Sequence, residues 1–190
     1  SCIFIARMLT GESLVSRSDW EWKHIKNMLK RGYVALDVGA NIGKLTIKMA
    51  GQVGSEGQVI AVEPNPVSYR LLLENIKLNG CKNCMALDAA VSSEKGKSLL
   101  VADFLEPQAT AMRPGAFTSR DPSSQGAIQI DVTTVDWIIS NFLNGRRVNF
   151  CKIDVEGEEM SVLKGSKTFL RTTGLNLWIE VHEPRASSNE

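Results

Sequence analysis

The sequence has little of what would mark a disulfide scaffold, a polyanion-binding protein or a membrane protein. Four cysteines in 190 residues are too few for a disulfide framework. The 22 lysines and arginines nearly balance 21 acidic residues, so the formal net charge is only +1. No apolar run reaches the roughly 18 residues of a membrane-spanning helix. We therefore expect no nucleic-acid partner held by bulk charge and no membrane span.

The amino terminus and the cysteines bear on the cellular compartment. Residues 2–6 are apolar, but Arg7 interrupts the run and no basic segment precedes it, unlike in a signal peptide. Cys81 and Cys84 form a C-x-x-C pair without a second pair at zinc-site spacing. We interpret them as ordinary loop and packing cysteines, with a redox or metal role as the lesser alternative. Together these features favour a cytoplasmic protein.

The chain alternates strand-like and helix-like segments, which is typical of one α/β domain over residues 1–190. The predicted core strands are 33–38, 58–62, 85–87, 149–153 and 175–181. The predicted helices are 18–32, with a Ser18/Glu21 capping box, then one from about residue 44, 65–80 and 158–164. We expect a Rossmann-like, doubly wound, mostly parallel sheet, with residues 1–31 as an N-terminal extension and helix. Residues 96–134, before the fourth core strand, are predicted to form a hairpin-like insertion that covers a substrate site.

The strongest local signal is the run D-V-G-A-N-I-G at residues 37–43, between a predicted strand and a predicted helix. Gly39 permits a sharp turn and a close approach of a ligand to the backbone. In doubly wound sheets, ligands bind at the edge where the carboxyl ends of the strands meet, which is where this turn is expected to lie. The order G-x-N-x-G departs from the dinucleotide fingerprint G-x-G-x-x-G, and the Asp37 carboxylate would repel a pyrophosphate. It would attract the ammonium and sulfonium groups of S-adenosylmethionine, which has no phosphate.

Two further acids stand at the ends of the next two strands. Glu63 ends the second strand, where a carboxylate can accept hydrogen bonds from both ribose hydroxyls. Asp88 ends the third strand and can accept from an adenine amino group, while the backbone near Ala89 meets the ring. Each acid alone could be a strand-end or helix-cap residue. Three acids at three successive strand ends are hard to explain by packing, so we predict a cofactor site.

These residues resemble the FkbM-type methyltransferases over about residues 32–183. The resemblance also rests on V-E-P-N-P at 62–66, K-I-D-V-E-G at 152–157, T-T-V-D at 133–136, V-L-K-G at 162–165 and I-E-V-H at 179–182. It implies a class I methyltransferase fold that uses S-adenosylmethionine to methylate a hydroxyl oxygen of a small-molecule or glycan-type acceptor. It also implies a cofactor site whose residues bind, in chain order, the methionine part, the ribose and the adenine of S-adenosylmethionine. The residues of this site would be Asp37, Gly39, Ala40, Asn41, Gly43, Glu63, Asn65, Asp88 and Ala89.

The acceptor side is expected beyond the fourth strand. A hydroxyl acceptor needs a base to take its proton, and the candidates are Asp154, then Glu156 and His182, an imidazole being suited to proton transfer near neutral pH. Glu156 could instead favour a helix N-terminus, and His182 could face solvent. Lys152 is expected to pair with a neighbouring carboxylate. With Glu180, the three candidates could also hold a hard divalent ion, but no spacing demands one and we expect none.

Two rival functions remain at this point. One is a non-catalytic, truncated or degenerate cofactor-binding module; the other is a nicotinamide-dependent oxidoreductase, disfavoured by the glycine pattern and Asp37. Few residues follow the predicted last strand, 175–181, which would leave an apolar sheet edge. We expect either a shortened C-terminus or a homo-oligomer that covers this edge.

Overall fold

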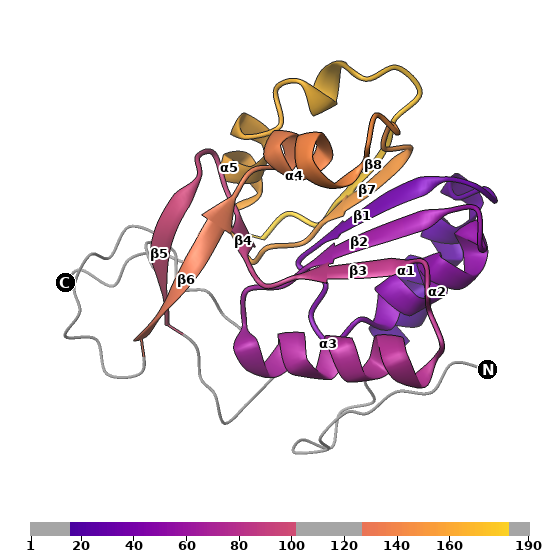
Figure 1. Cartoon of the computed structure of the whole chain (residues 1–190), viewed down its shortest axis with the longest axis horizontal. Coiled ribbons are helices and arrows are strands. Elements are labelled where there is room, and N and C mark those ends of the chain that lie inside the picture. Colours follow the sequence, from indigo (N-terminus) through magenta and orange to yellow (C-terminus); the bar gives the residue numbers. More distant parts are fainter. Residues whose placement is uncertain (1–15, 102–126, 183–190) are drawn as a thin grey trace.

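A parallel five-stranded sheet forms the centre of the computed structural model, which describes residues 16–101 and 127–182 (Figure 1). The strand order is β3-β2-β1-β7-β8. The strands are β1 (Val34–Val38), β2 (Gln58–Val62), β3 (Cys84–Leu87), β7 (Phe150–Ile153) and β8 (Asn176–Ile179). Because all four pairings are parallel, the carboxyl ends of the strands meet at one edge.

Helices cover both faces of this sheet, which confirms the predicted doubly wound α/β fold (Figure 1). One face carries α1 (Ser16–Ile25), α2 (Lys44–Val53) and α3 (Pro66–Leu78), and the other carries α4 (Val135–Phe142) and α5 (Glu159–Lys164). Side chains alternate between the faces along β1. Leu36 and Val38 pack in the cluster that includes α4, whereas Ala35 packs against α2. The sheet is therefore buried on both sides.

A smaller sheet lies beside the carboxyl edge, with the order β4-β6-β5. Its strands are β4 (Ala90–Val91), β5 (Gly96–Val101) and β6 (Ala127–Thr133). β5 and β6 pair antiparallel, as expected for a hairpin-like insertion, while β4 pairs parallel to β6. The sequence did not predict β4, because two residues are too few to show alternation. Residues 102–126 of this insertion lie outside the described residues, and its role as a cover over a substrate site stays a prediction.

Several boundaries differ from the sequence predictions. The Ser18/Glu21 capping box is wrong, since α1 already begins at Ser16 and Ser18 lies inside the helix. The first helix also does not continue to Gly32: it gives way to a 3₁₀ turn, η1 (Lys26–Met28), with extended backbone at the next residue. The helix α4 was not predicted. Its N-cap is Thr134, whose side chain accepts from the backbone N–H of Trp137.

The last strand, β8, lies at one edge of the five-stranded sheet, as predicted. Whether a second copy covers this edge stays a prediction. None of the helices in the described part of the chain is long and apolar enough to cross a membrane.

Candidate functional site

The turn between β1 and α2 takes a conformation that its residue types dictate. Gly39, Asn41 and Gly43 all have positive φ, at 81°, 51° and 86°. A Cβ atom on Gly39 would lie 1.8 Å from the backbone oxygen of Asp154, and one on Gly43 would lie 2.6 Å from Leu72 Cδ1. The two glycines therefore allow both the left-handed backbone and the close packing of the turn against its neighbours.

Glu63 ties this turn to the end of β2. One carboxylate oxygen accepts from the backbone N–H of Asn41 at 2.8 Å, and the other accepts from the backbone N–H of Asn65 at 2.9 Å. Burial raises the pKa of Glu63 to about 7, against the opposing effect of these two donors. Each oxygen retains a second lone pair, so the carboxylate can still accept hydrogen bonds from a ligand.

A pocket opens at the carboxyl edge beside this carboxylate. Six of the predicted site residues line it: Gly39, Asn41, Glu63, Ala89, Asp154 and Glu156. Its wall holds three carboxylates and, among the described residues, no lysine or arginine. A wall of this charge suits a cationic ligand and repels a pyrophosphate.

The other predicted cofactor residues lie behind or beside the pocket wall. The side chain of Asn65 is buried and caps α3 by accepting from the backbone N–H groups of Val67 and Ser68. Ala40 and Gly43 belong to the turn but do not line the pocket. Asp88 follows β3 with an exposed side chain. Ala40, Gly43 and Asn65 can act on a ligand through the turn and Glu63. Asp88 can act on it from the rim of the pocket.

Asp37 lies beneath the turn and is fully buried, facing α2. Its Oδ2 accepts from the hydroxyl of Thr46 at 2.6 Å. Its Oδ1 accepts no hydrogen bond from the described residues and lies 3.8 Å from Lys152 Nζ. Burial raises the pKa of Asp37, while the charge of Lys152 and the Thr46 hydrogen bond lower it. The structure thus places Asp37 next to Lys152, its direct partner in the β1–β7 register, and not in the pocket wall.

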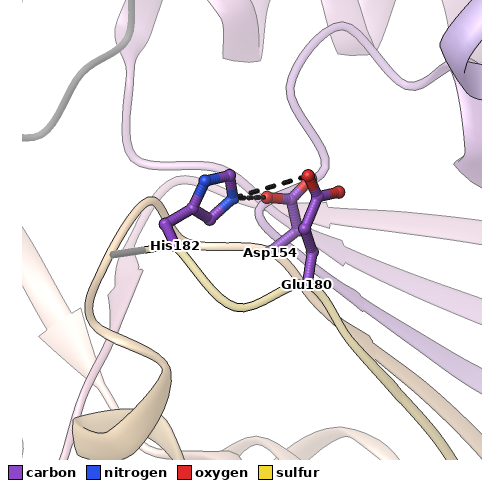
Figure 2. Close-up of side chains that lie close together, drawn as sticks. All are labelled: Asp154, Glu180 and His182. Carbon is purple, nitrogen blue, oxygen red and sulfur yellow. Dashed lines mark hydrogen bonds and ion pairs between the residues drawn. The ribbon is translucent and has the colours of Figure 1, made fainter. Parts of the chain in front are cut away.

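Asp154 and His182 meet where β7 and β8 end (Figure 2). Asp154 Oδ1 lies 3.0 Å from His182 Nε2, and its Oδ2 accepts from Lys152 Nζ at 2.9 Å. Burial raises the pKa of Asp154, but the charge of Lys152 and the hydrogen bonds from His182 and Lys152 outweigh it and lower the pKa below its usual value. Asp154 therefore stays ionised beside the imidazole, and the predicted pairing of Lys152 with a carboxylate is confirmed.

Two glutamates complete the surroundings of the imidazole. Glu180 Oε1 lies 3.7 Å from His182 Nε2, and Glu156 Oε2 lies 3.6 Å from Nδ1. Glu156 has φ 54° and Gly157 φ 109°, and the N–H of Gly157 donates to the buried Glu159 at 2.9 Å. This turn directs the carboxylate of Glu156 toward His182.

The same corner offers the atoms that a metal ion could use. Ligand atoms of Asp154, Glu180 and His182 lie within 4.8 Å of one another (Figure 2). Two carboxylates and an imidazole could hold a divalent ion. Glu156, the fourth predicted ligand, is not part of this group.

Sequence reasoning missed the contacts that cross between strands far apart in the chain. Nothing in the sequence signals that Asp37 on β1 pairs in register with Lys152 on β7. The roles of Thr46 and Glu159, which hold Asp37 and Gly157, were likewise not predicted. The only related signal was the position of Lys152 inside a predicted core strand, 149–153.

The C-x-x-C cysteines lie far from this site. They line a separate hollow at the amino-terminal edge of the sheet, together with Gly54, Asn83 and Arg146. Burial raises the pKa of Cys84, so little thiolate forms near neutral pH. This agrees with an ordinary packing role.

Comparisons with known proteins find one family model and several methyltransferases. The profile of the "Methyltransferase FkbM domain" matches residues 37–190. The chain is 27% identical over 172 residues to "Methyltransferase sdnD" of Sordaria araneosa, covering 78% of this chain and 66% of that protein. It is 29% identical over 150 residues to "Hexuronic acid methyltransferase AglP" of Haloferax volcanii, covering 78% of this chain and 56% of that protein. The chain thus spans less than two thirds of the length of these curated relatives.

A solved structure also resembles the chain. The precorrin-6y C5,15-methyltransferase of Geobacter metallireducens matches with a TM-score of 0.49 and 14% identity. That match covers 90% of this chain and 64% of the solved one.

Proposed function

Because this chain belongs to the methyltransferase FkbM domain family, we propose that it transfers a methyl group from S-adenosylmethionine to a hydroxyl oxygen of a small-molecule or sugar-containing acceptor. Membership confirms the predicted family and, with it, S-adenosylmethionine as the cofactor. The observation that carries the proposal is one pocket whose wall joins the Gly39 turn and Glu63 to Asp154, the partner of His182.

The donor side of the pocket fits the cofactor. The wall carries carboxylates and, within the described residues, no basic side chain, which favours a cationic group over a pyrophosphate. We assign the methionine part to the turn at Gly39 and Asn41, and the ribose hydroxyls to Glu63. Ala89 would lie against the adenine ring, and the exposed Asp88 would accept from its amino group. Asp37, Ala40, Gly43 and Asn65 would shape the turn and the wall from behind.

The acceptor side supplies a base. With its Nε2–H donated to Asp154, the imidazole of His182 keeps a lone pair on Nδ1; this tautomer is assigned from the hydrogen bond. In the proposed reaction Nδ1 takes the proton of the acceptor hydroxyl, and the Asp154 carboxylate stabilises the resulting imidazolium. Glu156, beside Nδ1, would accept a hydrogen bond from the acceptor. When bound, S-adenosylmethionine supplies a methyl carbon activated by its sulfonium.

The experiment that tests this function uses S-adenosylmethionine with a deuterated methyl group and a library of glycosides, sugars and uronates. The relative named a hexuronic acid methyltransferase makes uronates a first choice. Mass spectrometry should find one product class with the labelled methyl group on oxygen. Tight cofactor binding without transfer to any acceptor would favour a non-catalytic module, and binding of NAD alone would favour an oxidoreductase.

Cofactor binding should depend on the protonation of Glu63. Its raised pKa, about 7, means that the carboxyl becomes neutral as the pH falls below 7 and then accepts hydrogen bonds poorly. Asp37 and Lys152 also influence this carboxyl, in opposite directions. We expect the affinity for S-adenosylmethionine to be full above pH 8 and to fall by up to about tenfold per pH unit below 7.

Calorimetry between pH 5.5 and 8.5 measures this slope. Glu63→Gln should bind more weakly at high pH and lose the dependence, whereas Glu74→Gln, at an exposed position of α3, should keep it. A wild-type affinity that is flat across this range would refute a ribose-binding role for the ionised Glu63.

A further inference from the structure

Lys152 is the only lysine or arginine buried in the parts of the chain that the structure describes. It lies near the end of β7, and its side chain is only 4% exposed. Burying an ammonium group without partners is costly, so a lysine in such a place needs charged or polar neighbours. None of the roles proposed above for cofactor or acceptor involves this residue.

The contacts of Lys152 join two parts of the site that are far apart in the sequence. Its Nζ donates to Asp154 Oδ2 at 2.9 Å, on the acceptor side. It also donates to the carbonyl oxygen of Gly39 at 3.4 Å, in the cofactor turn. Asp37 Oδ1 lies 3.8 Å away, on the neighbouring strand. One ammonium group therefore reaches the cofactor turn and the acceptor side at once.

The charges around Lys152 agree with this arrangement. Burial lowers the pKa of Lys152, but Asp37 and Asp154, together with Glu21 from α1, outweigh it, so the pKa is raised. The lysine thus stays charged. It is the only lysine or arginine of the described residues in hydrogen-bond contact with Asp154.

We propose that Lys152 is a positioning residue: it holds the Asp154 carboxylate in line with His182 and ties that pair to the Gly39 carbonyl of the cofactor turn. What the pair does in catalysis rests on the proposed function, but the link itself needs no acceptor. Asp154 has one oxygen on Lys152 and the other on His182. Loss of the lysine would free one oxygen, so the carboxylate could rotate away, and would leave Asp37 buried without a cation.

The test reads the hydrogen position on the His182 ring by nitrogen-15 NMR at a fixed alkaline pH, together with calorimetry of S-adenosylhomocysteine. In the wild type, Nε2 should carry the hydrogen that it donates to Asp154. Lys152→Met should lose this preference for Nε2, because the Asp154 carboxylate is no longer held, and should weaken S-adenosylhomocysteine binding about tenfold or more.

Matched variants separate positioning from mere space filling. Lys152→Arg should restore the Nε2–H signal of His182. Lys97→Met removes a lysine that also pairs with an aspartate at 2.9 Å, but at an exposed place on β5, and should change neither readout. If Lys152→Met does not fold, Asp37→Asn/Lys152→Met removes the uncompensated buried charge and should fold while still showing the loss of the Nε2 preference at His182.

Two results would overturn the proposal. One is a wild-type His182 whose ring hydrogen is not on Nε2. The other is a folded Lys152→Met or double variant in which the His182 ring signals match those of the wild type. A failure of methyl transfer with every acceptor would contradict the proposed function only, because the NMR and binding measurements need no acceptor and decide the role of Lys152 by themselves.

Discussion

Gly39→Ala is expected to abolish measurable binding of S-adenosylmethionine and to lower the free energy of unfolding by more than about 3 kcal/mol. The new Cβ would lie 1.8 Å from the carbonyl oxygen of Asp154 and 2.8 Å from its carbonyl carbon. Both are backbone atoms of the neighbouring strand end, so no side chain can move aside. The positive φ of 81° adds about 1 to 2 kcal/mol of conformational strain for any residue other than glycine.

Gly32→Ala is the matched control. Gly32 has nearly the same φ, 80°, but a Cβ there would meet nothing within 4 Å. It should therefore cost only the conformational part, about 1 to 2 kcal/mol, and leave cofactor binding intact. Urea unfolding and calorimetry compare the two. If Gly39→Ala were as stable as Gly32→Ala and still bound the cofactor, the close packing of the turn against β7 would not govern the site.

The second large effect concerns His182. We expect His182→Gln to lower the rate of methyl transfer by about 10² to 10⁴-fold and to leave the affinity for S-adenosylmethionine nearly unchanged. The reason is that the ion-pair contacts of the imidazole are with Asp154 and the two glutamates at the acceptor corner, none of which is assigned to the cofactor. Single-turnover assays with the acceptor found in the library screen would measure it.

His24→Gln controls for this substitution, because His24 is the only other histidine of the chain and lies exposed on α1. It should leave the rate unchanged. The assay is repeated with a chelator and with added magnesium. A rate that vanishes with the chelator and returns with magnesium would assign activation to an ion at Asp154, Glu180 and His182. A rate that is equal for His182→Gln and the wild type would exclude His182 as the base.

The sequence was most informative where local chemistry decides the structure. The strand at 58–62 is found at those residues, because a run of β-branched and apolar residues follows a turn. Asn65 is the N-cap of α3, as predicted, with a proline at the first helical position. The glycine turn was also predicted, since positive φ and close packing restrict the residue types strongly. Parallel pairing then brings the strand-end residues Glu63 and Asp154 to one pocket.

The parts that could not be predicted depend on contacts between distant segments. A strand buried on both faces carries no pattern that says which face a side chain takes. Asp37 could therefore be predicted at the edge of the site, but not its orientation toward α2 or its pairing with Lys152 across the β1–β7 register. The same holds for Glu159, whose hydrogen bond to Gly157 shapes the turn that carries Glu156.

The most direct test of the account is a calorimetric titration of the chain with S-adenosylhomocysteine and, separately, with NAD. We predict one saturable site for S-adenosylhomocysteine that S-adenosylmethionine competes for, that Gly39→Ala loses and that Gly32→Ala keeps, with no binding of NAD. Binding of NAD in place of S-adenosylhomocysteine, or S-adenosylhomocysteine binding that survives Gly39→Ala unchanged, would contradict a methyl-donor site at this turn.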